Sequence, residues 1–174
     1  MIYEPDEDSF LLVKCVKKLA KNKKVLDMGT GFGILAETAI RSGAVDVLAV
    51  DINEEVIDYV KSKGIKARVS DLFSNVNEKF DLIVFNPPYL PEDEMEDEET
   101  RRITTGGKRG YELLNRFLVD AKRFLNKNGQ ILIVFSSLTH KDKIDETLKK
   151  NKYKFECLEK KKLFFEELYV YLIS

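Results

Sequence analysis

The sequence predicts an α/β protein with a doubly wound, mostly parallel seven-stranded sheet and a C-terminal antiparallel strand. Apolar segments typical of buried strands alternate with segments of helical periodicity, which is the pattern of a parallel sheet covered by helices. The last two strand segments read as a closing antiparallel pair. The predicted strands cover residues 24–27, 47–51, 66–72, 80–85, 130–135, 153–158 and 164–173. A first helix is predicted to end near residue 21, and four further helices cover about 34–42, 54–63, 111–125 and 141–150.

Composition limits the class of protein. The 174 residues, 44% of them hydrophobic, suit one compact domain over residues 1–174. With 29 basic and 30 acidic residues, no overall field attracts the chain to nucleic acid or to a membrane surface. No apolar run has the length of a membrane span, and Cys15 and Cys157 are too few and too far apart for a metal site. We therefore expect a cytoplasmic protein without a metal centre.

The first predicted element is a helix within residues 1–22. Pro5 and several acidic residues precede an apolar run, and this order is typical of a helix start. Glu7, Asp8 and Ser9 fit capping roles at this position.

A glycine-rich turn follows the first predicted strand. Gly29, Gly31 and Gly33 let the backbone pass close to a ligand. The third glycine comes one residue too early for the dinucleotide-binding fingerprint G-x-G-x-x-G. Asp27 stands just before the turn, where it can receive an ammonium group.

The next two strands also end in aspartates. Asp51 lies about twenty residues beyond the glycines, where a carboxylate accepts hydrogen bonds from ribose hydroxyls. Asp71 ends the third strand, where its carboxylate can accept from an adenine amino group while the Leu72 N–H reaches the ring. Each aspartate taken alone also fits an ordinary cap or turn.

Asn86-Pro87-Pro88-Tyr89 follows the buried strand of residues 80–85. The two prolines force a stiff, extended exit from the sheet. The Asn86 amide oxygen and the Pro87 carbonyl can then accept both hydrogens of an –NH2 group, while the Tyr89 ring stacks on the flat group that carries it. The alternative is a turn that ends a strand and places a tyrosine in the core.

Four polar residues share one predicted sheet edge. Asp27, Asp51, Asp71 and Asn86 fall at the carboxyl ends of four successive strands. Ligands of doubly wound sheets lie outside these ends, where the strand order reverses. The pattern therefore predicts a ligand site there.

Residues 90–110 are predicted to form a loop on the substrate side. Seven acids among residues 92–99 indicate a solvated segment, with substrate contact as the alternative. The run from Gly106 is not a phosphate-binding loop, because Arg102 and Arg109 stand where that motif needs Gly and Ser or Thr.

The motifs resemble those of class I S-adenosylmethionine-dependent methyltransferases, which have a Rossmann-like fold. The chain is similar to the HemK/PrmC-related family, and specifically to its short eukaryotic and archaeal branch, which methylates the glutamine of peptide chain release factors. Four segments carry the resemblance: residues 3–12, 27–33, 86–89 and the glycines at 106, 107 and 110.

The resemblance implies the site residues. The catalytic residues would be Asn86, Pro87, Pro88 and Tyr89, and the cofactor-binding residues would be Ser9, Asp27, Gly29, Gly31, Asp51, Asp71, Leu72 and Asn86. Relatives often have Glu at the position of Asp27 and Thr at that of Ser9, and both changes keep the hydrogen-bonding group. The helix within residues 1–22 would cover the cofactor.

The resemblance also implies partners. Bacterial relatives hold their release factor with an added helical domain, so substrate docking here would use the catalytic domain or a small zinc-binding activator subunit. The third strand is the expected edge of the sheet, where a partner can add a strand and bury Ile65, Val69 or Phe73. Two other functions remain open, namely methylation of adenine or cytosine amines in DNA or RNA, and a binding module without catalysis.

Overall fold

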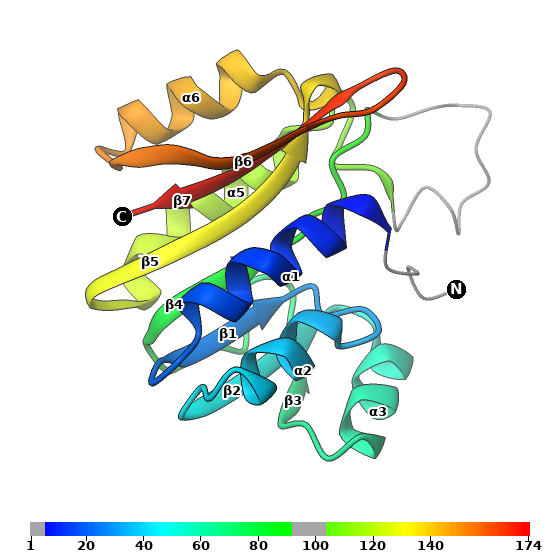
Figure 1. Ribbon diagram of the computed structural model, residues 1–174, viewed down its shortest axis with the longest axis vertical. Coiled ribbons are helices and arrows are strands. Elements are labelled where there is room, and N and C mark those ends of the chain that lie inside the picture. The colour runs from blue at the N-terminus through cyan, green and yellow to red at the C-terminus, as the bar shows by residue number, and fades with distance from the viewer. Residues whose placement is uncertain (1–5, 92–103) are drawn as a thin grey trace.

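The computed structural model describes residues 6–91 and 104–174 (Figure 1). Within these ranges the helices are α1 (Glu7–Leu19), α2 (Ile34–Arg41), α3 (Glu54–Ser62), α5 (Glu112–Ala121) and α6 (Lys141–Lys150), with short 3-10 helices η1 (Lys122–Phe124) and η2 (Ser137–Thr139). The strands are β1 (Lys24–Met28), β2 (Asp46–Asp51), β3 (Ala67–Val69), β4 (Phe80–Phe85), β5 (Leu125–Ser136), β6 (Phe155–Lys162) and β7 (Glu167–Ile173).

The strands form one seven-stranded sheet in the order β3-β2-β1-β4-β5-β7-β6. The first five strands in this order pair in parallel, while β7 is antiparallel to both of its neighbours. The predicted fold class is confirmed. The chain builds outward from β1 to β3 and then returns to place β4 on the other side of β1. The strand order thus reverses between β1 and β4, which is where such sheets bind ligands.

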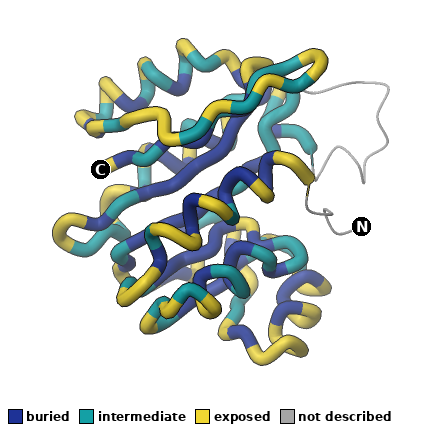
Figure 2. Tube along the Cα trace, viewed as in Figure 1, coloured by how far each residue is buried: buried dark blue, intermediate teal, exposed yellow. Residues whose placement is uncertain are grey.

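Helices cover both faces of the sheet. Apolar residues of α1, α2 and α3 pack with one set of strand side chains, and those of α5 and α6 pack with the other set. Neighbouring residues of β1 alternate between the two clusters, Val25 in one and Leu26 in the other, as the pleat requires. Figure 2 shows the central strands buried along their length, with exposed residues on the outer sides of the helices.

Several predicted boundaries were wrong. The third strand covers Ala67–Val69 rather than residues 66–72, because the chain turns away at Leu72, where φ is +47°. The helix predicted to end near residue 125 ends at Ala121, and β5 begins at Leu125. The Asn and Gly residues that indicated a helix stop lie instead inside β5. There the register with β4 shifts between Phe80 and Leu82.

The predicted partner-binding edge is only partly as expected. β3 is the strand at one edge of the sheet, with β6 at the other, and Val69 on β3 is 39% exposed. Ile65 and Phe73, however, are already buried in the core of this chain, so the expectation that a partner covers them is wrong. Among the described residues, no helix is both long and apolar enough to cross a membrane.

Candidate active site

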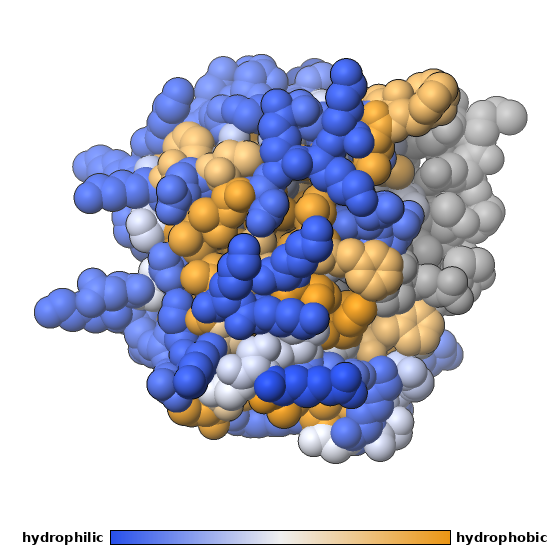
Figure 3. Space-filling view, viewed as in Figure 1, coloured by the Kyte–Doolittle hydropathy of each residue, from blue (hydrophilic) through white to orange (hydrophobic). Residues whose placement is uncertain are grey.

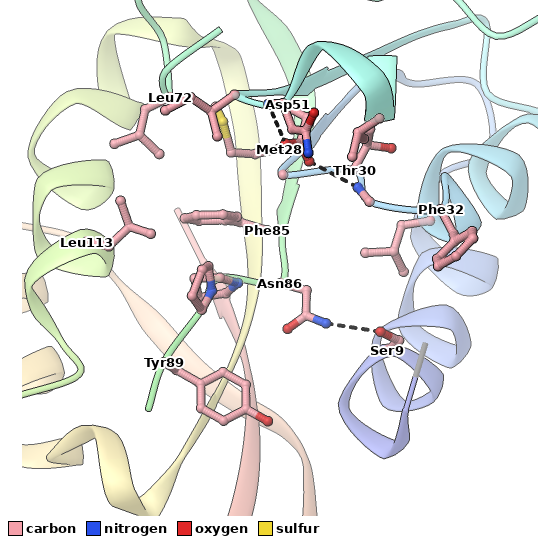
Figure 4. A pocket seen from close by; sticks show the side chains of 18 of the residues that line it. Ser9, Met28, Thr30, Phe32, Asp51, Leu72, Phe85, Asn86, Tyr89 and Leu113 are labelled. Atoms are coloured by element: carbon pink, nitrogen blue, oxygen red, sulfur yellow. Dashed lines mark hydrogen bonds between the residues drawn. The ribbon is translucent and has the colours of Figure 1, made fainter. Parts of the chain in front are cut away.

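A cavity of about 970 Å³ opens at the carboxyl ends of the parallel strands. Its lining includes the start of α1, the glycine turn after β1, the end of β2 with the start of α3, the turn after β3, the Asn-Pro-Pro-Tyr motif after β4, Thr104 with Thr105, and Leu113 of α5 (Figure 4). The expected site residues that line the cavity are Ser9, Gly29, Gly31, Asp51, Asp71, Leu72, Asn86, Pro87, Pro88 and Tyr89. Asp27 is not among them.

The glycine turn lies tightly against the sheet. Gly29 has a φ of +63°, and an added Cβ there would lie 3.2 Å from the Phe85 ring. The Gly31 N–H donates to Asp51 Oδ2 at 3.2 Å, and the Asn53 N–H donates to Asp51 Oδ1 at 3.0 Å. Burial raises the pKa of the Asp51 carboxyl, and these backbone donors oppose the shift. Asp51 is therefore an oriented acceptor on the cavity wall.

Asp27 supports the turn from behind. It is buried, and its Oδ2 accepts from Thr30 Oγ1 at 2.7 Å and from the Ala36 N–H at 3.0 Å. Its Oδ1 has no hydrogen-bond partner among the described residues. Burial raises the pKa of Asp27 to about 7, although both hydrogen bonds lower it. In this structure Asp27 thus joins the turn to the start of α2.

Asp71 and Leu72 lie at the other end of the cavity. Asp71 follows β3 and forms an ion pair with Arg116 of α5. Both side chains are about half exposed, so the pair contributes little to stability. Leu72 lines the cavity together with Leu113 of α5, and both lie at the left of the view in Figure 4.

Asn86 is held by the first turn of α1. Its Nδ2 donates to Ser9 Oγ at 3.0 Å (Figure 4). Its Oδ1 is buried and has no partner among the described residues. Because the amide nitrogen is occupied by Ser9, the oxygen is the group that Asn86 presents to a ligand. A buried acceptor of this kind is costly unless a ligand supplies the missing donor.

Tyr89 is held by the same helix turn. Its hydroxyl donates to Asp8 Oδ2 at 3.0 Å, and Asp8 is only 3% exposed. The N-cap of α1 is Asp6, which accepts from the Glu7 N–H, and Asp8 Oδ1 also accepts from the Ser9 N–H, so Asp8 joins the start of the helix to Tyr89. Asp8 lies on the same helix stripe as Leu12, a fully buried residue. A charged residue on an apolar stripe was the sequence signal for this contact.

The segment around Gly106 supports the backbone of the motif. An added Cβ at Gly106 would lie 2.2 Å from the Gly110 carbonyl oxygen and 2.7 Å from that of Pro88. The Leu90 N–H donates to the Thr104 carbonyl at 2.9 Å, and the Gly106 N–H donates to the Leu90 carbonyl at 3.0 Å. This part of the predicted substrate-side loop therefore supports the motif, and Leu90, Thr104 and Thr105 in it also line the cavity. The acidic run of residues 92–99 and Arg102 lie outside the described residues.

Comparisons with known proteins identify the family of the chain. The family model for the methyltransferase small domain matches residues 3–165. The chain belongs to this methyltransferase family. The resemblance predicted from the motifs is thus confirmed, and the cofactor of these enzymes is S-adenosylmethionine.

Two relatives have names that specify a methylated residue. A Methanocaldococcus jannaschii protein described as a candidate protein N5-glutamine methyltransferase is 41% identical over 97% of this chain and 89% of its own length. A Streptococcus pneumoniae release factor glutamine methyltransferase is 30% identical over 76% of this chain. The matched region spans 53% of that bacterial enzyme, or about half of its length.

Solved structures of methyltransferases share the fold. A chain of the E. cuniculi Mtq2–Trm112 complex, which is responsible for methylation of the eRF1 translation termination factor, matches with a TM-score of 0.82 and 26% identity. The match covers 99% of this chain and 98% of that one. A ribosomal protein L11 methylase from Lactobacillus delbrueckii matches with a TM-score of 0.71.

Proposed function

We propose that this methyltransferase modifies the side-chain amide nitrogen of a glutamine in a protein, and that the protein is a peptide chain release factor. The buried Oδ1 of Asn86, which has no hydrogen-bond partner within residues 6–91 and 104–174, carries the proposal. A primary amide offers two N–H donors on one flat group, which fits one acceptor from Asn86, one from the Pro87 carbonyl and the ring of Tyr89. The names of the relatives support the same substrate.

The chemistry follows from what the motif can bind. An amide nitrogen is a poor nucleophile, because its lone pair is delocalised into the carbonyl. Acceptors for both N–H groups favour a pyramidal nitrogen and stabilise the positive charge that grows on it during attack, so they act most strongly in the transition state. Tyr89, oriented by Asp8, sets the plane of the amide. Holding this nitrogen in line with the methyl donor adds the proximity effect.

The remaining cavity fits S-adenosylmethionine, which when bound supplies an electrophilic methyl group on a sulfonium. We assign Asp51 to the ribose hydroxyls, and Asp71 with the Leu72 N–H to the adenine. Gly29, Gly31 and Ser9 would contact the rest of the cofactor, since all three line the cavity. Asp27 would act through the glycine turn, because it lies behind that turn.

The direct test is mass spectrometry after incubation with isotope-labelled S-adenosylmethionine. A release factor and a tRNA preparation are offered in separate reactions. We expect one labelled methyl group on a glutamine side chain of the release factor. Label on a base of the tRNA, with none on the protein, would favour the exocyclic-amine alternative instead.

We also propose a small zinc-binding activator subunit. The structural relative in the Mtq2–Trm112 complex supports such a partner. In this chain the exposed edge at β3 is the surface that suits it, because an edge strand has backbone groups that a second chain can pair.

A further inference from the structure

The tip of the β6–β7 hairpin exposes two neighbouring aromatic rings. Phe164 is 92% exposed and Phe165 is 87% exposed, and the rings meet edge to face with centroids 4.8 Å apart. In Figure 3 the tip is a hydrophobic projection at the upper right of this face. Aromatic side chains supply much of the binding energy of protein interfaces, so two together in water mark a contact surface.

The hairpin turn does not need these residues. The Leu163 N–H donates to the Glu166 carbonyl at 2.8 Å and closes the turn around Phe164 and Phe165. Tight hairpin turns favour Asn, Asp and Gly, whose backbones adopt turn conformations at low cost, and phenylalanine has no such advantage. Leu163 already supplies the turn with a contact to the core. The formation of the hairpin therefore does not explain why two phenylalanines stand at its turn.

The hairpin is attached to two elements that hold Tyr89, namely α1 and η2. On one side Lys161 forms an ion pair with Glu7 in the first turn of α1. On the other side the Glu167 N–H donates to Ser137 Oγ at 3.1 Å. The 3-10 helix η2, which contains Ser137, also holds the Tyr89 carbonyl through a side-chain hydroxyl at 3.1 Å. The tip thus projects from the rim of the cavity.

The charges near the tip argue against a nucleic acid as the molecule that binds to Phe164 and Phe165. Three consecutive lysines precede the turn. Lys160 pairs with Glu167 at 3.0 Å, and Lys161 pairs with Glu7. Binding to a phosphate backbone depends on lysines that are available to replace counterions, and here two of the three have carboxylate partners. The chemistry that the tip offers is mainly apolar.

We propose that Phe164 and Phe165 dock the protein substrate by entering an apolar pocket on its surface. This inference rests on the proposed function. A glutamine side chain is short, so the substrate backbone must pass over the rim next to Tyr89 while the side chain reaches Asn86. The hairpin stands beside that rim and can contact the substrate at a distance from the modified residue.

The test compares two substrates. The double variant F164N/F165G removes both rings and installs residues that favour a tight turn, so the hairpin is retained. Val45→Ser is the matched control, because Val45 is 68% exposed and precedes β2 at the opposite end of the sheet. For each protein kcat/KM is measured with the intact release factor and with a short peptide that carries the same glutamine. Thermal unfolding and S-adenosylmethionine affinity are measured in parallel.

We expect F164N/F165G to lower kcat/KM for the intact release factor by roughly tenfold, mainly through KM, as for loss of an aromatic anchor. Turnover of the peptide, cofactor affinity and Val45→Ser should stay at wild-type levels. Equal kcat/KM on the intact factor would overturn the inference, as would loss of self-association or of activator binding instead of substrate binding. If the wild-type protein modifies neither substrate, the proposed function fails, and this inference fails with it.

Discussion

At the scale of single residues, the site depends on how Asn86 and Tyr89 are oriented. The first turn of α1 holds both: Ser9 accepts from the Asn86 amide, and Asp8 accepts from the Tyr89 hydroxyl. The acceptor oxygen of Asn86 is left in the cavity without a partner among the described residues. The tetrapeptide alone therefore does not make the site, because α1 sets the direction of its side chains.

Asn86→Ala removes this acceptor while leaving β4 unchanged. We expect turnover to fall by about 100-fold or more, the effect of losing one preorganised hydrogen bond to the transition state. The melting temperature should change little, since Asn86 lies after the strand and at the cavity. Steady-state methylation and circular dichroism measure the two effects separately. Wild-type turnover in the variant would contradict the proposed chemistry.

Asp51→Ala tests the cofactor assignment. The carboxylate accepts from two backbone N–H groups and still lines the cavity. Loss of its contacts to the ribose hydroxyls should weaken S-adenosylmethionine binding by about 1–3 kcal/mol. Isothermal titration calorimetry gives the affinity directly. Unchanged affinity would remove Asp51 from the cofactor site.

The buried carboxyl of Asp27 predicts a pH dependence of stability. Its pKa in the folded protein is about 7, above the ordinary value of 3.8, so the folded state binds the proton more tightly than the unfolded state does. The free energy of unfolding should therefore decrease as pH rises from about 4 to about 7, through this residue alone by roughly 3–5 kcal/mol.

Asp27→Asn isolates this contribution. The variant keeps an oxygen to accept from Thr30 and Ala36 but carries no charge. Urea unfolding of both proteins at several pH values should show a difference that grows between pH about 4 and 7 and is constant above. Parallel pH profiles would show that Asp27 titrates normally.

At the scale of elements, the sequence predicted the strands that build the site better than the segments that support it. Strand ends were visible because apolar runs stop at a polar residue, as at Asp51 and Asn86. The contacts of Asp8 with Tyr89 and of Gly106 with Pro88 join residues far apart in the chain. No local sequence pattern predicts such contacts. Two local features do suggest them: Asp8 is a charged residue on an apolar helix stripe, and Gly106 is a glycine outside any predicted turn.

Gly106→Ala tests the support of the motif by the segment that follows it. The added methyl group would lie 2.2 Å from one carbonyl oxygen and 2.7 Å from another, so the backbone of Pro88 or of Gly110 must move. We expect a destabilisation of about 1–3 kcal/mol and a larger loss of turnover, because the motif shifts with it. Gly64→Ala is the control for a loss of stability alone, since its φ of +77° strains an alanine there while the added Cβ meets no atom within 4 Å. Equal turnover in both variants would show that this packing is dispensable.

At the scale of the whole molecule, the sheet topology was predictable and the strand boundaries were not. Alternating strand and helix segments indicate a doubly wound sheet. Because the crossover connections between parallel strands are right-handed, few strand orders are possible. The start of β5 at Leu125 depends on pairing with Phe80, which no local propensity encodes. In the same way, the burial of Ile65 and Phe73 follows from packing against other elements and not from their nearness to an edge strand.

The last prediction concerns β3, the strand at one edge of the sheet. β3 pairs with β2 on one side, and Val69 on it is partly exposed. The neighbouring Arg68 forms an ion pair with Glu78 at 2.9 Å. Because Glu78 balances its charge, Arg68 opposes the pairing of an added strand less than an unpaired arginine would. A partner strand can therefore hydrogen-bond to β3 and cover Val69.

We expect coexpression with the proposed zinc-binding subunit to raise the soluble yield and to increase methylation of the release factor by about tenfold or more, which corresponds to about 1.4 kcal/mol. Val69→Asp should abolish this gain, because it places a charge in the new contact while leaving the cavity unchanged. Val119→Asp on α5, a more exposed valine on another element, is the control. Size-exclusion chromatography reports the complex, and activity assays with and without the subunit report its effect. A chain that is fully soluble and equally active alone would contradict the prediction, and an undiminished gain with Val69→Asp would place the partner elsewhere.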